Sequence, residues 1–261
     1  MGQGNGVSLL RNNQEVYGTV EFAAWANRSD LDAAERFVLS RYLERERSTL
    51  EAGTGGGRIL FALKAMGFAS LAGFDFVPAF VEEARRKDSA GAIRFEVADA
   101  TKLPYADASV EQIVYLQQIV SLVESAARRQ MVMKESFRIL KAGGTALFSF
   151  LSYEVRANGL AYRLFLTYLR GLRLLSGSRR SVQSLPWLKL GGRPNFGALL
   201  DREPHVYWFK AAEAVALLEQ AGFHLRAIGT EHQMRSGRMC GSAAELCGET
   251  MDGGLYCVCG K

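Results

Sequence analysis

The sequence predicts an α/β protein in which a mostly parallel sheet is covered by helices on both faces. Helical and strand-like patterns alternate along residues 30–151, which is typical of parallel sheets joined by crossover helices. The segment 110–116, VEQIVYL, is almost continuously apolar after Gln112, as expected of a strand buried on both faces. A chain of 261 residues, 48% of them hydrophobic, can bury such a core as one large domain.

Each element has its own signal in the sequence. The first is an amphipathic helix over 30–46, with Asp30 as its expected cap. Pro78 marks the start of a later helix, because proline is favoured in the first helical turn. The remaining expected elements are a strand ending near Glu51, a helix through Met66, strands at 71–75, 93–97, 110–116 and 145–151, a helix over about 122–139, a turn at KAGG (141–144), a helix over 210–223, and strands at 223–229 and 254–261.

The glycine-rich turn after the first strand is the expected ligand site, since ligands of such sheets bind at the carboxyl ends of the strands. No Gly-Lys-Ser/Thr sequence follows it, which argues against an NTPase. A dinucleotide fingerprint starting at Gly53 and Gly55 would have Arg58 at its third glycine position. Asp75 suits any ligand with ribose hydroxyls. Glu51 would repel a pyrophosphate, yet it suits a ligand that carries an ammonium and a sulfonium.

Four motifs in order over residues 49–150 carry a family resemblance. EAGTGGG (51–57) resembles the first motif of class I S-adenosylmethionine-dependent methyltransferases, and GFDFVPAFVEEAR (73–85) is similar to their second. VADATKLPYADASVEQIVYLQQIVSLVE (97–124) and RILKAGGTALFSF (138–150) resemble the stretches around the fourth and fifth strands. The resemblance implies a Rossmann-like three-layer sandwich with a seven-stranded, mostly parallel sheet, a helical insertion after strand five, and S-adenosyl-L-methionine as cofactor.

The resemblance also implies which residues hold the cofactor. Glycine turns let the backbone approach the methionine part, and a carboxylate would lie near the ammonium. The positions for this end of the ligand are Glu51, Gly53, Gly55, Gly57, Leu116 and Gln117. At the other end, Asp75 would accept both ribose hydroxyls and Phe76 or Val77 would cover one adenine face. Asp99 would accept the adenine amine, and the Ala100 amide would donate to a ring nitrogen.

No catalytic base follows from the resemblance, because QQIVSLVE after the fourth strand offers no histidine. Methyl transfer from a sulfonium is an in-line displacement that proximity and alignment can accelerate. A base is needed only if the acceptor must lose a proton, as a hydroxyl must. The candidates for that role are His205, Tyr207 and His232, each of which also has a structural interpretation.

These inferences divide the chain into four segments. Residues 1–46 form an N-terminal lid and helix, and 47–151 the cofactor-binding half of the core. Residues 152–203 form a basic helical insertion that serves as substrate lid, and 204–261 supply a helix and an antiparallel strand pair that complete the core. The insertion holds eight arginines and Lys189 against three acidic residues. Within it, Arg163, Arg170 and Arg173 alternate with apolar residues like an amphipathic helix.

The basic insertion is compatible with more than one kind of methyl acceptor or partner. The preferred interpretation is a lid over a small-molecule acceptor, with an anionic acceptor as one option and transfer at O, N or C. An RNA methyltransferase, acting for example on tRNA, is the alternative, because arginines beside aromatic residues pair with phosphates and stack on bases. A membrane surface ranks last among these partners. A cofactor-binding scaffold without catalysis is the second alternative. The oligomeric state is not predicted.

The four cysteines, Cys240, Cys247, Cys257 and Cys259, cluster near the end of the chain. The last two are expected to point to opposite faces of a final edge or hairpin strand, so no metal is expected. A four-thiolate zinc site is the alternative. The N-terminal sequence lacks a signal-peptide pattern, and no apolar run approaches the ~20 residues that cross a bilayer. A cytoplasmic protein is therefore expected.

Overall fold

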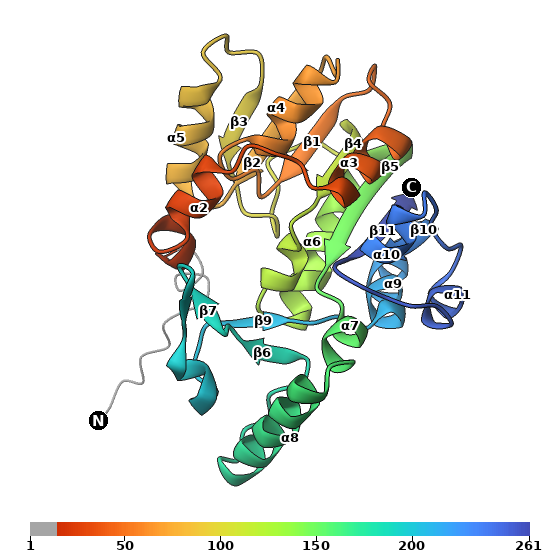
Figure 1. Cartoon of the computed structure of the whole chain (residues 1–261). Coiled ribbons are helices and arrows are strands. Elements are labelled where there is room, and N and C mark those ends of the chain that lie inside the picture. Colours follow the sequence, from red (N-terminus) through yellow and green to blue (C-terminus); the bar gives the residue numbers. More distant parts are fainter. Residues whose placement is uncertain (1–14) are drawn as a thin grey trace.

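The computed structural model, which describes residues 15–261, is built around one seven-stranded sheet (Figure 1). Its strand order is β10-β11-β5-β4-β1-β2-β3. Only β11 runs antiparallel to its neighbours, β10 and β5, and the other pairs in the sheet are parallel. The predicted α/β class and the mostly parallel, seven-stranded sheet are thus confirmed. The strands of the sheet are β1 (Thr49–Ala52), β2 (Leu71–Asp75), β3 (Arg94–Val97), β4 (Val110–Tyr115), β5 (Leu140–Phe150), β10 (His224–Thr230) and β11 (Leu255–Gly260).

Helices pack on both faces of the sheet and form two apolar cores. One face is covered by α3 (Ala33–Tyr42), α4 (Arg58–Ala65), α5 (Pro78–Lys87) and α10 (Glu231–Arg235). The other is covered by α6 (Ala126–Ile139), α9 (Ala211–Gln220) and α11 (Ala243–Cys247). Strand β4 contributes to both cores, because Ile113 packs in one and Val114 in the other. The continuous apolar run therefore predicted this central strand correctly.

Several local features differ from the positions or structures that the sequence predicts. The cap of α3 is Asp32, not Asp30: its carboxylate accepts the Glu35 amide, and the Glu35 carboxylate accepts the Asp32 amide in return. A 3₁₀ turn, η1 (Ile119–Leu122), precedes α6, so the helix expected from about 122 begins at Ala126. KAGG does not separate the helix from the strand as a turn. It lies within β5, opposite an irregularity in the pairing with β4.

The final strand differs from the expectation in two ways. It is not an edge strand, because β11 lies between β10 and β5. Cys257 and Cys259 do not point to opposite faces either. Side chains two residues apart in a strand share a face, and both thiols are buried in the core beneath α6 and α9. Burial raises the pKa of both thiols, which keeps them protonated.

The insertion after β5 is mixed rather than purely helical. It contains α7 (Tyr153–Ala157), α8 (Leu160–Leu175), a 3₁₀ turn η2 (Phe196–Leu200) and three short strands. Strand β6 (Ser184–Pro186) pairs with β9 (His205–Tyr207), which follows the insertion, and β7 (Lys189–Leu190) pairs with β8 (Arg193–Pro194). None of the helices in residues 15–261 is long and apolar enough to cross a membrane.

A buried ion pair joins the N-terminal helices to the glycine turn. Arg58, the first residue of α4, donates two hydrogen bonds of 2.6 Å to the Glu35 carboxylate of α3. Their side chains are only 6% and 0% exposed. Arg58 also donates to the Asp30 carbonyl oxygen at 2.8 Å, before α3 begins. The residue that argued against a dinucleotide site is therefore the one that ties α3 to the start of α4.

We predict that Arg58→Ala lowers the free energy of unfolding by about 3–5 kcal/mol, because it leaves the Glu35 carboxylate buried without its partner. Chemical denaturation followed by circular dichroism measures the change. The matched control is Arg86→Ala, which removes an exposed arginine from the surface pair with Glu83 and should change stability little. Equal effects of the two substitutions would show that the buried pair has no special structural role.

Candidate functional site

A cavity that opens to solvent lies at the carboxyl ends of β1, β2 and β4. Its walls are mostly apolar, with a small number of polar groups pointing inward. Nine of the eleven sequence-predicted cofactor residues line it: Glu51, Gly53, Gly55, Asp75, Phe76, Val77, Asp99, Ala100 and Gln117. Gly57 and Leu116 do not. Gly57 is the N-cap of α4, and Leu116 is buried against the helices on the α3 side of the sheet.

The glycine turn brings backbone close to the cavity. Gly53 and Gly55 both have positive φ angles, 65° and 52°, which L side chains rarely adopt. Gly56 has a different constraint: a Cβ there would lie 2.5 Å from the Ala26 carbonyl oxygen at the end of α2 (Phe22–Asn27). The turn thus needs glycine both for its own conformation and for contact with the N-terminal segment.

Asp75, at the end of β2, is held by the backbone of two turns. Its carboxylate accepts the Gly55 amide at 2.9 Å and the Val77 amide at 3.0 Å. Burial raises the pKa of Asp75 to about 6, although these hydrogen bonds partly offset the effect. The carboxyl is ionised above that pH and lies in the cavity wall, as expected of an acceptor for ribose hydroxyls.

Glu51, in β1, is the second buried carboxyl of the cavity. Thr54 Oγ1 donates to its Oε2 at 2.8 Å. Burial raises the pKa of Glu51 to about 8, so in the ligand-free protein the side chain is mostly protonated at neutral pH. A bound ammonium or sulfonium would favour the ionised form. Two carboxyls in one small cavity suit a cationic ligand and disfavour a phosphate.

Asp99 also lines the cavity, and its carboxylate already accepts hydrogen bonds from the protein. Oδ1 accepts the Thr101 amide at 2.9 Å and Oδ2 accepts Arg128 at 2.9 Å. Burial opposes ionisation, but the hydrogen bonds from Thr101 and Arg128 outweigh it and lower the pKa of Asp99. The carboxylate that the resemblance assigns to the adenine amine is thus already bound by Thr101 and Arg128. Phe76 and Val77 stand in the same wall.

The residues after β4 have an unusual backbone. Gln117 and Gln118 have positive φ angles of 55° and 56°, and consecutive non-glycine residues in that region are strained. The amide group of Gln117 contacts two N-terminal residues: Arg28 donates to its oxygen at 2.9 Å, and its nitrogen donates to Glu35. The strain therefore coincides with the point where the N-terminal segment meets the cavity.

The N-terminal segment forms the roof of the cavity and contacts the insertion. Tyr17 and Trp25 of the N-terminal segment line the cavity. Tyr17 packs edge-on against Trp187 of the insertion, with ring centroids 5.6 Å apart, and Glu21 accepts the Gly191 amide at 2.6 Å. The two lids predicted from the sequence thus contact each other.

None of the three candidate catalytic residues lines the cavity. His205 lies between Asp201, at 3.0 Å, and Arg180, at 2.6 Å. Burial lowers the pKa of His205, although Asp201 opposes the effect. Tyr207 donates to Glu213 at 2.5 Å and its ring stacks under Arg129. His232 belongs to α10, beyond β10. The contacts of His205 join β9 to the insertion, and those of Tyr207 join β9 to α9 and α6.

Sequence reasoning missed several residues of the cavity. Thr54 stood inside the glycine motif and could have been named as the partner of Glu51. Tyr17 and Trp25 gave no usable signal, because lone aromatic residues in a short helix do not show what they cover. Glu124 and Arg128 also line the cavity, and Glu124 Oε1 is buried without a hydrogen-bond partner among the described residues.

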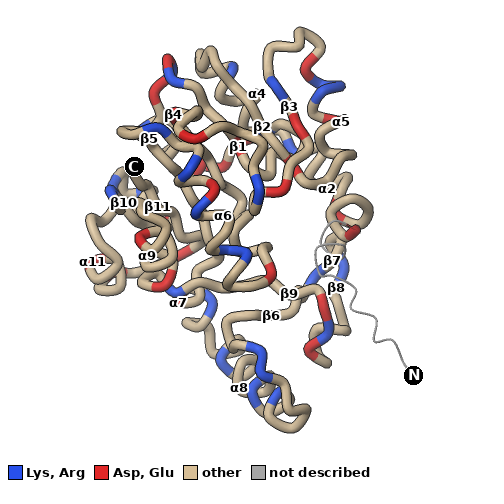
Figure 2. Tube along the Cα trace, turned by 180° about the vertical axis from the view of Figure 1, so that it is seen from behind, with Lys and Arg blue, Asp and Glu red and all other residues tan. Residues whose placement is uncertain are grey.

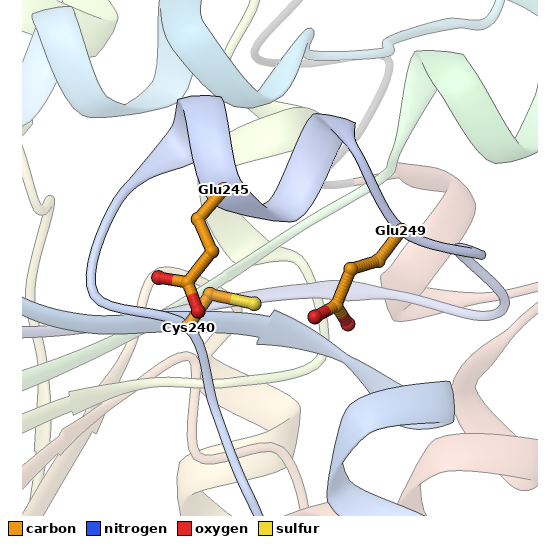
Figure 3. A group of neighbouring side chains, drawn as sticks. All are labelled: Cys240, Glu245 and Glu249. Atoms are coloured by element: carbon orange, nitrogen blue, oxygen red, sulfur yellow. The ribbon is translucent and has the colours of Figure 1, made fainter.

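A separate group of potential metal ligands lies near the C-terminus. Ligand atoms of Cys240, Glu245 and Glu249 are within 4.8 Å of one another (Figure 3). Both carboxylates already have protein partners: Arg238 pairs with both Glu249 oxygens at 2.8 Å, and Glu245 accepts the Gly241 amide at 2.8 Å. None of the three residues lines the cavity.

The sheet order, the glycine turn and the paired carboxylates define a Rossmann-like methyltransferase fold. Residues 50–148 match the model of the methyltransferase domain family. The chain is 31% identical to a demethylmenaquinone methyltransferase of Thermus thermophilus over 181 residues, which cover 68% of this chain and 73% of that protein. Other curated methyltransferases match over 37% to 59% of their own length. The chain belongs to the class I S-adenosylmethionine-dependent methyltransferase family.

Solved structures agree on the fold. A methyltransferase from Methanosarcina mazei has a TM-score of 0.63 at 21% identity, with 86% of this chain and 96% of that chain covered. The [4+2]-cyclase SpnF has a TM-score of 0.60 at 16% identity, with 97% and 95% covered. A protein titled as a cyclase shares the architecture, so the fold alone does not define the reaction.

We predict that Asp75→Ala weakens binding of S-adenosylhomocysteine by about 2–3 kcal/mol, because two hydroxyls lose a charged acceptor. Isothermal titration calorimetry measures the affinity, and thermal unfolding of the ligand-free variant checks its fold. The control is Glu219→Ala, an exposed carboxylate on α9. Unchanged affinity of a folded Asp75→Ala protein would place the ribose elsewhere.

The raised pKa of Glu51 predicts pH-dependent binding. Between about pH 6.5 and 8 the free carboxyl is protonated, and a cationic ligand must displace that proton. Affinity for S-adenosylmethionine should therefore rise with pH in this window, by roughly tenfold per unit at most. Glu51→Gln should flatten the slope, and adenosine, which lacks the amino-acid part, should show no slope in either protein. A slope retained in the variant would assign the proton to another group.

Proposed function

We propose that this protein transfers the methyl group of S-adenosylmethionine to a small-molecule acceptor at O, N or C. The observation that carries the proposal is the pair of buried carboxyls, Glu51 and Asp75, beside the glycine turn at the strand ends. Together with the adjacent apolar wall they fit a ligand that has a cationic amino-acid part, a ribose and an adenine. The cofactor would supply an electrophilic methyl group on a sulfonium.

The chain's own residues bind, orient and exclude water. Glu51 and the Gly53–Gly55 backbone hold the amino-acid end, and Asp75 holds the ribose. Tyr17 and Trp25 close the cavity from above, which limits access of water to the reacting groups. In-line displacement then depends mainly on the alignment of the acceptor with the methyl group.

The relatives favour a small acceptor. Two are named demethylmenaquinone methyltransferases, and a third is named a ubiquinone/menaquinone biosynthesis C-methyltransferase. Their names favour carbon among the three acceptor atoms. The tRNA alternative loses support from the insertion, where Arg173 is bound to Asp201, Arg180 to Glu203 and Arg156 to aromatic rings. Three of its eight arginines thus serve the fold.

A transfer assay with methyl-labelled S-adenosylmethionine tests the proposal. The purified chain is incubated with small-molecule, lipid and RNA fractions of the source cell, and we expect label in a small organic-soluble or small polar product. Asp75→Ala serves as the negative control. Label in RNA would favour the RNA alternative. Cofactor binding without transfer to any fraction would favour the scaffold without catalysis.

A further inference from the structure

Helix α8 of the insertion is apolar on two opposite faces. Its inner face buries Leu166 and Leu169 against Leu185. Its outer face exposes leucines near both ends: Leu160 is 72% exposed, Leu164 65%, Leu174 83% and Leu175 89%. At 100° per residue these four side chains lie within one stripe on the side away from Leu169. Thr167 and Gly171 lie between the two pairs of leucines on this face.

The 3₁₀ turn η2 extends this apolar stripe. The Tyr168 hydroxyl of α8 donates to the Leu199 carbonyl oxygen at 2.6 Å, which holds η2 beside the helix. Phe196, Leu199 and Leu200 of η2 are all at least half exposed. We call these three residues and the four exposed leucines of α8 the outer apolar surface. Large exposed apolar side chains gathered on one side of a segment are typical of an interaction site.

Arginines border the outer apolar surface. Arg163 and Arg170 are exposed on α8 along one edge of the leucine stripe, and Figure 2 shows basic segments along this helix. Neither guanidinium forms an ion pair within residues 15–261. Arg173, one turn away on the inner face, is instead held by Asp201 at 2.6 Å. The helix thus separates a structural arginine inside from cationic groups outside.

We propose that the outer apolar surface docks on an anionic lipid membrane. Leucine and phenylalanine side chains would enter the boundary between headgroups and acyl chains, and Arg163 and Arg170 would pair with lipid phosphates. Figure 1 shows α8 at one end of the molecule, beyond β6 and β9 and away from the sheet, so a flat surface can approach it. This docking does not depend on the acceptor proposed above.

Charge favours a membrane over a second copy of the chain. A symmetric dimer through this face would bring the arginines of both copies to one interface, where like charges repel. Anionic phosphates complement them. From the sequence, a membrane surface ranked last among the partners of the insertion. The exposed second face of α8 reverses that ranking.

Co-sedimentation of the full chain with vesicles tests the proposal. Vesicles of phosphatidylcholine alone are compared with vesicles containing about 30 mol% phosphatidylglycerol. We expect binding to be roughly tenfold tighter with the anionic lipid and to weaken as salt rises. Leu174→Glu with Leu175→Glu should weaken it by more than roughly tenfold. The matched control, Met131→Glu, alters an exposed apolar residue of α6 outside the surface and should bind normally.

A second variant separates the effect of charge from that of apolar side chains entering the membrane. Arg163→Gln with Arg170→Gln should remove most of the preference for anionic lipid, by roughly tenfold, and leave any weak binding to phosphatidylcholine unchanged. S-adenosylhomocysteine binding and thermal unfolding, measured on each variant, confirm that the fold is intact. Failure of the wild-type chain to bind anionic vesicles would overturn the proposal. A lipid-free dimer that the leucine variant converts to monomer would overturn it as well, by assigning the surface to a second copy.

Discussion

The buried Arg58–Glu35 ion pair is the constraint on which the rest of the site depends. It fixes the first residue of α4, and with it the glycine turn, to a helix that precedes the sheet in sequence. Glu35 also accepts a hydrogen bond from Gln117, at the end of β4. One carboxylate therefore connects α3, the glycine turn and the strained loop after β4. Its removal would disturb both stability and the shape of the cavity.

The cavity holds polar groups that destabilise the ligand-free fold. Glu51 and Asp75 are buried with raised pKa values, so the folded protein disfavours their ionised forms until a ligand compensates. The positive φ angles of Gln117 and Gln118 add backbone strain at the same place. Burial, charge and strain thus coincide around one opening, as is common where a protein binds its ligand. The apolar cores on both faces of the sheet hold these groups in place.

The insertion uses its arginines in two ways. Arg156, Arg173 and Arg180 face aromatic rings, carboxylates or His205 and hold the segment together. Arg163 and Arg170 face outward beside exposed leucines. Net charge alone could not distinguish these groups, because every arginine adds the same charge to the basic excess of residues 152–203. Only the direction of each side chain separates the structural role from the proposed contact with lipid.

The sequence by itself determined the sheet, its parallel core and most of the cofactor wall. These features depend on local patterns, such as the continuous apolar run of β4 and the carboxylates at strand ends, which need no knowledge of distant contacts. It misplaced the face of Cys259 and the cap of α3, and it grouped His205, Tyr207 and His232 near a site that none of them lines. It also could not find Tyr17 and Trp25 in the roof. Tertiary packing decided these positions, because the surroundings of a side chain depend on segments far away in the chain. In the same way, the helical pattern of α8 does not show whether each of its apolar faces packs against another segment.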